Sequence, residues 1–234
     1  MQLSYSISFL CKKMNMRKLI VMMFIIISFS SFGQKFTAGV QAGFVSASYL
    51  AGGDQYINAS SISAYEFGAT GSFHLKDHLY LESGLSWIQK GSVKTKTIIA
   101  VNGGSTTIKI NYLELPVNLD YKFKLNKDLK GFVGAGIYIA AGMSGKETGQ
   151  EVTIAGNNAI NRNVQFTTNS NYSASYTSVT PIDFGTDAFA GVEYKNFDVA
   201  LNYSKGSSKV ETTSSTKYQH QTFGVSVGYA WNLK

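Results

Sequence analysis

Residues 223–231 read FGVSVGYAW, and every second residue of this stretch is large and apolar. Successive side chains of a β-strand point to opposite faces, so the large residues would share one face and glycine, serine and alanine the other. The large residues are Phe223, Val225, Val227, Tyr229 and Trp231. A strand with one broad apolar face and one face of tiny side chains is typical of a small β-barrel in a lipid bilayer.

The composition agrees with β-structure. Proline occurs twice in 234 residues, whereas glycine occurs 23 times, tyrosine 14 times and phenylalanine 15 times. A mean hydropathy of −0.03 is too low for a helical membrane protein. It suits a membrane barrel, because about half of each barrel strand is polar.

The first part of the chain has the pattern of a secretory signal peptide. Residues 16–18 (MRK) are basic, residues 19–32 are almost purely apolar, and small residues surround Gly33. This apolar run is shorter than the ~20 residues of a membrane-anchoring helix. We predict cleavage after Gly33, which makes residues 1–33 the signal peptide and residues 34–234 the mature domain.

Met14 and Met16 offer a second start, so residues 1–13 need not belong to the translated protein.

Removal of the signal peptide changes two properties of the chain. The single cysteine, Cys11, lies in the removed part, so the mature chain has no disulfide framework. Cleavage also leaves 17 basic and 14 acidic residues, a formal charge of +3, and this weak basicity gives no support for a nucleic-acid partner.

Alternation with a period of two recurs along the mature chain. It predicts strands at 36–44, 65–73, 79–87, 113–123, 133–139, 183–194, 197–204 and 223–231. An even number of strands is what a single-chain bacterial barrel needs to close with antiparallel neighbours. Pro116 lies inside one of these strands, where it removes a hydrogen-bond donor, and we expect it to mark a bulge.

The connections between the predicted strands alternate in length. Three short ones lie near 76–78, 126–128 and 195–196, and four longer ones near 47–62, 92–107, 143–180 and 207–216. Outer-membrane barrels have short periplasmic turns and long extracellular loops. The sequence therefore predicts an all-β fold, an eight-stranded antiparallel transmembrane barrel of up-and-down topology, with both termini in the periplasm.

Acidic residues fall on the inward face of the predicted strands. They are Glu66, Glu82, Glu114, Asp183, Asp187 and Glu193. They could form a buried polar network with inward Lys90, His74, His220, Tyr80 and Tyr138, because eight strands enclose an interior that side chains just fill. The alternative is a carboxylate ring that makes a cation-selective pore or a divalent-ion site.

The motifs that would indicate catalysis or a cofactor are absent from the sequence. It has three histidines, and it contains neither a Gly-x-Ser-x-Gly elbow, a His-Glu-x-x-His motif, nor cysteines with metal-site spacing. We therefore expect no enzyme activity, no cofactor and no metal.

The long segment 143–180 is the best candidate for surface recognition. It combines polar residues with Lys146, Arg162, Phe166, Tyr172 and Tyr176, and long loops on a rigid scaffold often carry function. It could bind an extracellular partner, or it could be a solvated cap against lipopolysaccharide. Further lysines are expected near the same end of the barrel, where they would face anionic lipid headgroups: Lys94, Lys96, Lys109, Lys205, Lys209 and Lys217.

Several short motifs recur in the predicted strands: YLELPV at 112–117 with DYKF at 120–123, DFG at 183–185 leading to GVEY at 191–194, and GVSVGY at 224–229. With these motifs the chain resembles the PorT-like outer-membrane β-barrel family of Bacteroidetes. The resemblance spans the mature chain and implies an outer-membrane barrel. It implies no activity, because most members of that family have none assigned.

We therefore expect a barrel inserted by the barrel-assembly machinery into the outer membrane, in contact with lipid and lipopolysaccharide, with a structural or surface-interaction role. The first alternative is a small passive pore. The second is a secreted lipocalin-like carrier, which would need an apolar interior and a polar exterior. Our preferred interpretation needs the reverse: an apolar outer surface and an interior of small or hydrophilic residues.

Overall fold

The computed structural model describes residues 36–51, 57–98, 101–153, 156–169, 173, 175–214 and 216–233. The predicted signal peptide lies outside these residues. In the described part of the chain, no helix is long and apolar enough to cross a membrane.

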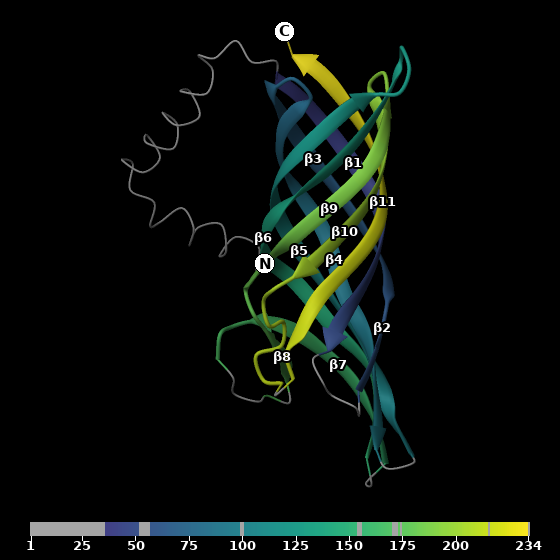
Figure 1. The fold of residues 1–234 in the computed structure, drawn as a ribbon. Helices are drawn as coiled ribbons and strands as arrows, with labels where there is room; N and C mark the ends of the chain where they lie inside the picture. Colours follow the sequence, from purple (N-terminus) through teal and green to yellow (C-terminus); the bar gives the residue numbers. More distant parts are fainter. Residues whose placement is uncertain are drawn as a thin grey trace, which may run out of the picture. The chain divides into compact units, whose positions relative to one another are not determined.

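The described residues form eleven β-strands (Figure 1). They are β1 (Phe36–Ala51), β2 (Ile57–Ser60), β3 (Ile62–Lys76), β4 (Leu79–Ile98), β5 (Val101–Lys124), β6 (Leu129–Thr153), β7 (Gly156–Phe166), β8 (Tyr176–Val179), β9 (Ile182–Tyr194), β10 (Phe197–Gly206) and β11 (Tyr218–Leu233).

Eight of these strands close into a ring. The order is β1–β3–β4–β5–β6–β9–β10–β11, and every neighbouring pair is antiparallel. The first and last strands close the ring by pairing from Phe36 with Leu233 to Ala51 with Tyr218. The predicted eight-stranded antiparallel barrel is confirmed.

One end of the ring, which we call the turn rim, carries the three short connections. Asp77-His78 joins β3 to β4, residues 125–128 join β5 to β6, and Lys195-Asn196 joins β9 to β10. Asp77 and Lys195 have φ angles of 51° and 56°, the left-handed backbone that two-residue hairpin turns require. Phe36 and Leu233 lie at the same rim, so the barrel domain begins and ends there.

The opposite end, the loop rim, is built differently from the prediction. Residues 92–107 and most of 143–180 were expected to be loops, but residues 92–98, 101–107, 143–153, 156–166 and 176–179 are strands: β4 and β5 pair to Ile98 and Val101, and β6 continues to Thr153 before β7. A tilted strand needs about 9–11 residues to cross a bilayer, whereas β5 has 24 and β6 has 25. The surplus forms a projecting sheet, made of β2, the loop-rim ends of β4, β5 and β6, and β7 and β8 (Figure 1).

Among the described residues the strand register shifts at three places, and none of them is the predicted one. Pro116 pairs with Tyr138 of β6 without a change of register, and the β4–β5 register is the same on both sides of it. The β5–β6 register shifts instead between Asn111 and Tyr112, where β6 carries one extra residue, Met143. The expectation of a bulge at Pro116 is therefore wrong.

The outer surface of the ring is apolar, as predicted. Along β11, Phe223, Val225, Val227 and Trp231 are exposed while Ser226 is buried, and the other ring strands alternate in the same way. Aromatic side chains form two belts, which is where amphipathic rings meet the membrane interfaces. Near the turn rim the belt contains Tyr121, Tyr194, Phe197, Tyr229 and Trp231, and towards the loop rim it contains Phe44, Tyr65, Phe184, Tyr203 and Phe223.

The interior has two unlike halves, and only one of them was predicted. The half near the turn rim is polar. The half near the loop rim is filled by an apolar plug of fourteen buried residues: Val45, Ala47, Tyr49, Ile62, Ala64, Ile88, Ile108, Ile110, Tyr112, Tyr138, Ala140, Val179, Val210 and Tyr218. The expectation that small or hydrophilic residues line the whole bore is wrong for this half, because the plug contributes the packing that closes the barrel.

Candidate functional site in the barrel interior

A buried ion-pair cluster lies where the plug meets the polar half. Lys90 is 0% exposed, and its Nζ lies 2.7 Å from Oε2 of Glu114 and 3.4 Å from Oδ2 of Asp183. The Tyr138 hydroxyl donates to the same Asp183 oxygen at 2.9 Å, and its ring lies 3.9 Å from the Lys90 ammonium. Such contacts offset the cost of burying charge, and they bring together Lys90, Glu114, Asp183 and Tyr138 of the predicted network.

The two histidines predicted to join that network behave differently. Nε2 of His220 lies 3.1 Å from the Tyr112 hydroxyl, and the His220 ring packs edge-on against Tyr49 and Tyr112, which are residues of the plug. His74 bonds the backbone oxygen of Asp77 in the turn and packs against Tyr80. His220 therefore lies against the plug and His74 lies at the turn, rather than in the ion-pair cluster of Lys90.

A second ion-pair cluster lies near the turn rim. Lys122 and Lys130 bind the two carboxylate oxygens of Glu193 at 2.9 and 2.6 Å. The Lys122 ammonium also faces the rings of Tyr80 and Phe132, at 5.1 and 5.9 Å. Lys122 was missed as a site residue, although its even number places it in the inward phase of β5.

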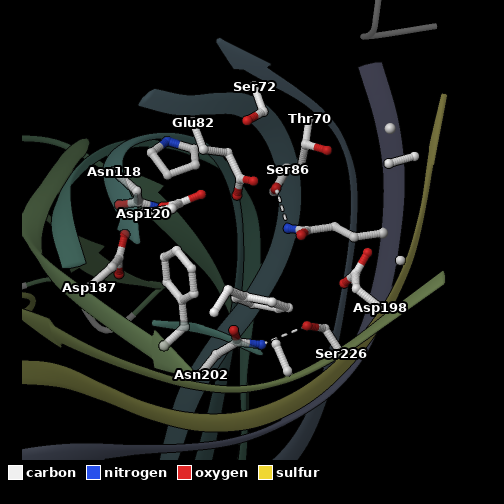
Figure 2. A pocket seen from close by; sticks show the side chains of 18 of the residues that line it. Thr70, Ser72, Glu82, Ser86, Asn118, Asp120, Asp187, Asp198, Asn202 and Ser226 are labelled. Carbon is white, nitrogen blue, oxygen red and sulfur yellow. Dashed lines mark hydrogen bonds between the residues drawn. The ribbon is translucent and has the colours of Figure 1, made fainter. Parts of the chain in front are cut away.

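Between these two clusters is a polar cavity of about 120 Å³ (Figure 2). Its walls carry seven carboxylates: Glu66, Glu82, Glu114, Asp120, Asp187, Glu193 and Asp198. The lining extends from Asp198 and Glu193, next to the turn at 195–196, to Glu114 beneath the plug. Asp120 and Asp198 were not predicted as site residues, although their inward phase could have identified them.

Inward glycines provide room for these acids. A side chain at Gly134 would begin 2.7 Å from Oδ1 of Asp120, and one at Gly43 would begin 2.8 Å from Oε1 of Glu66. Gly228 lies in the same way against the carboxylate of Asp198. The alternation of glycine with acid across neighbouring strands is what fits so many carboxylates into a narrow ring.

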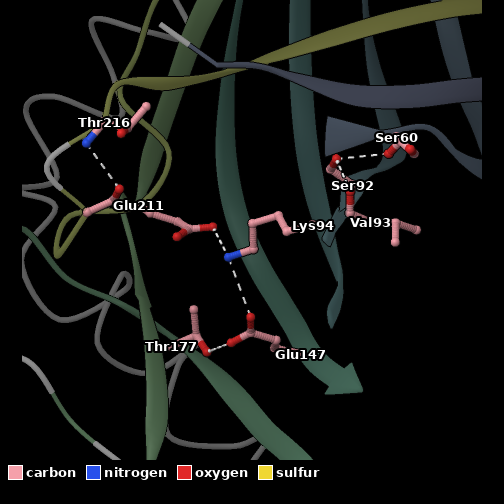
Figure 3. Close-up of polar contacts among 9 residues, drawn as sticks. Ser60, Ser92, Val93, Lys94, Glu147, Thr177, Glu211 and Thr216 are labelled. Carbon is pink, nitrogen blue, oxygen red and sulfur yellow. Dashed lines mark hydrogen bonds and ion pairs between the residues drawn. The ribbon is translucent and has the colours of Figure 1, made fainter. Parts of the chain in front are cut away.

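A third cluster ties the segments beyond the loop rim to the barrel (Figure 3). Lys94 of β4 binds Glu211 at 2.7 Å and Glu147 at 3.5 Å, and Thr177 of β8 donates to Glu147 at 2.5 Å. Burial alone would raise the pKa of Glu147, but Lys94 and Thr177 outweigh it and lower this pKa. The prediction that Lys94 faces lipid headgroups is wrong, because its side chain points inward and pairs with Glu147 and Glu211.

The residues predicted for surface recognition divide into exposed and packed ones. Lys146 is exposed on β6, and Arg162 is half-buried on β7, opposite Glu147. Phe166 is not a surface residue, because it packs against the plug and over Gly142. Tyr176 is half-buried at the start of β8, and Tyr172 lies outside the described residues.

The part of the chain that the structure describes contains no metal-binding cluster of side chains. There, no three histidine, cysteine, aspartate or glutamate side chains are arranged to hold a metal ion. The carboxylates surround the cavity rather than converging on one point.

The closed antiparallel ring, the apolar exterior and the aromatic belts together define a membrane-spanning β-barrel. A family model described as "Outer membrane protein beta-barrel domain" matches residues 29–210, so the chain belongs to that family. The family and the apolar exterior assign the barrel to the outer membrane.

Solved structures of bacterial outer-membrane proteins are similar to it in fold. OprG from Pseudomonas aeruginosa is 14% identical, with a TM-score of 0.47 and coverage of 86% of this chain and 98% of OprG. Neisserial surface protein A is 13% identical, with a TM-score of 0.41 and coverage of 82% and 96%. Ail, the attachment invasion locus protein of Yersinia pestis, is 11% identical, with a TM-score of 0.40 and coverage of 84% and 99%. No curated protein is significantly similar to the chain in sequence.

Proposed function

We propose that this protein is a non-catalytic surface platform: a closed outer-membrane barrel that holds the projecting sheet outside the cell for interaction with an extracellular partner. The observation that carries the proposal is the length of β5 and β6. They continue as one paired ladder from Lys124 and Lys130 at the turn rim to Gly104 and Glu151. A rigid ladder of this length positions a surface far better than a flexible loop would.

The outer strand of this sheet offers the best contact surface. On β7, the amide side chains of Asn157, Asn158, Asn161, Asn163 and Gln165 are exposed. β7 pairs with β6 from Gly156 to Asn163 and with β8 only from Asn163 onwards. Exposed amides and an edge strand are both suited to hydrogen bonding with a partner.

The same orientation would bring a group of lysines to the outer leaflet. Lys109 and Lys146 are paired neighbours on β5 and β6, and both are exposed, as is Lys205 at the end of β10. We infer that they contact lipopolysaccharide phosphates. The short turns and both ends of the barrel domain would then face the periplasm, with insertion by the barrel-assembly machinery.

The pore alternative fits less well, because the plug fills the loop-rim half of the bore. The carrier alternative also fits less well, because the apolar side chains of the ring are on the outside. The motif at 112–117 supports a finer proposal, that the protein is a PorT-like barrel of Bacteroidetes.

Cysteine labelling on intact cells tests the platform. The mature chain has no cysteine of its own, so Asn158→Cys in β7 and Lys127→Cys in a turn are matched single probes. We expect a membrane-impermeant maleimide to label position 158 on intact cells and position 127 only after the cells are opened. The reverse pattern would overturn the proposed orientation.

Two further measurements address the role itself. A photo-crosslinking amino acid at 158 is expected to give a discrete adduct on living cells, while one at 127 gives none of the same mass. In planar bilayers, the purified protein is expected to conduct no steady ion current. Steady conductance would favour the pore instead.

A further inference from the structure

The polar cavity near the turn rim holds more carboxyl groups than its lysines pair with. Glu114 is paired with Lys90, and Glu193 with Lys122 and Lys130. The other five carboxylates have no ion pair with any lysine or arginine of the described residues: Glu66, Glu82, Asp120, Asp187 and Asp198. Unpaired carboxylates in a confined space are costly, so this cavity favours a positively charged occupant.

A second observation points to a ligand rather than to acidity alone. Asn118 and Ser72 are neutral, 6% and 7% exposed, and both line the cavity. Oδ1 of Asn118 and Oγ of Ser72 have no hydrogen-bond partner, and neither does Oδ1 of Asp120. Figure 2 shows these residues around the same hollow as Glu82. Since two of the three atoms can only accept, the missing partner is a hydrogen-bond donor.

The chemistry of the walls selects among cations. A single metal ion needs several oxygens on one point, and the described residues provide no such group. An ammonium group needs dispersed acceptors and tolerates aromatic faces. The cavity already accommodates one: Lys122, with its ammonium on Glu193 and facing the rings of Tyr80 and Phe132.

Size restricts the ligand further. Pockets for drug-sized molecules have volumes of roughly 300–1,000 Å³, whereas this one has about 120 Å³. A peptide or an oligosaccharide does not fit, but a short aliphatic chain does. Its two ends can meet carboxylates on different walls, since Asp120 belongs to β5, Asp187 to β9 and Asp198 to β10.

We propose that the turn-rim cavity binds a small aliphatic diammonium ion, which enters from the turn rim. Its ammonium groups donate to the carboxylates and to Asn118 Oδ1, and its short methylene chain lies along Phe132 and Phe189. The site is separate from the projecting sheet, so this proposal does not depend on the platform function.

Calorimetric titration of the detergent-solubilised protein with 1,4-diaminobutane tests this inference. We expect saturable binding with one site per barrel, and none with 1,4-butanediol, the neutral analogue of the same length. Asp120→Asn and Asp198→Asn should each weaken binding by roughly tenfold to a hundredfold, because each removes a charge-assisted hydrogen bond.

Asp128→Asn is the matched control, because Asp128 is an exposed carboxylate of the turn at 125–128 and does not line the cavity. It should leave the affinity unchanged. Heat-modifiable gel mobility verifies folding, and if Asp120→Asn fails to fold, Asp198→Asn at the rim provides the comparison. Absent or non-saturable diamine binding would overturn the proposal. Equal binding of the diol, or binding of CaCl2 that the diamine does not displace, would also overturn it.

Discussion

Nζ of Lys90 lies 2.7 Å from Oε2 of Glu114, and the two residues come from neighbouring strands of the ring, β4 and β5. Lys90 is fully buried, and Asp183 approaches it from β9 at 3.4 Å. The strands that carry these three groups are joined through β6, so the cluster crosslinks one side of the wall. It is also the boundary between the apolar plug and the acidic cavity.

Lys90→Met should strongly destabilise the barrel. The substitution retains the bulk of the side chain but leaves Glu114 and Asp183 buried without their cation, a loss of about 3–5 kcal/mol in the free energy of unfolding. Urea unfolding in lipid vesicles measures it. Lys109→Met, at an exposed lysine of β5, is the control and should change stability by less than about 0.5 kcal/mol. Equal effects of the two variants would contradict this role for Lys90.

Val227→Arg should hinder insertion. Val227 is exposed in the middle of the apolar face of β11, and an arginine at the centre of the bilayer costs roughly 2–4 kcal/mol. The yield of folded protein in vesicles, read from the heat-modifiable gel shift, is expected to fall. Thr213→Arg, at an exposed position in the segment after β10, should insert normally. If the Val227 variant inserts as well as that control, this face does not contact hydrocarbon.

Gly134→Ala should destabilise the polar half of the interior. The new methyl group would lie 2.7 Å from Oδ1 of Asp120 and would overlap the ring of Phe189, so both must move, at about 1–3 kcal/mol. Gly71→Ala is the comparison, because its methyl group would meet only the edge of the Phe36 ring at 3.1 Å, and this ring can rotate. We expect a clearly lower unfolding midpoint for Gly134→Ala than for Gly71→Ala.

The barrel could be predicted from the sequence because lipid imposes a simple rule on each strand. Every second residue of 223–231 must be apolar, and the same rule identified the outward face of all eight ring strands. It also placed Lys90 and the six predicted acids inward. Local alternation carries this information without knowledge of any distant partner.

The rule stops where the membrane stops, and the prediction failed there. Residues 92–95, 104–107 and 156–166 lie beyond the apolar band, and their threonines, asparagines and glycines are typical of loops. The partners of Lys94 could not be inferred either, because Glu147 and Glu211 are distant in the sequence and meet Lys94 only after β6 and the segment after β10 are placed. The apolar plug was overlooked because tyrosines, isoleucines and alanines from most of the ring strands contribute one or a few residues each.

The cluster of Lys94, Glu147 and Glu211 should release its segments in acid. It lies beyond the exposed Lys109–Lys146 pair, outside the apolar band. Because the folded protein lowers the pKa of Glu147, this residue contributes stability that is fully present above its unfolded pKa, near the ordinary value of 4.5. That stability is lost as the pH falls through the lower pKa of the folded state. Lys94, whose pKa is raised, keeps its charge throughout this range.

Amide-resolved NMR in detergent at pH 6 and pH 3 measures the release. Signals from residues 176–179 and 207–214 should shift or broaden in acid, while those of Leu201 and Val225 in the ring stay in place. Glu147→Gln should show the released pattern already at pH 6. If the variant and the parent protein have the same spectra at both pH values, the ion pairs to Lys94 do not hold these segments.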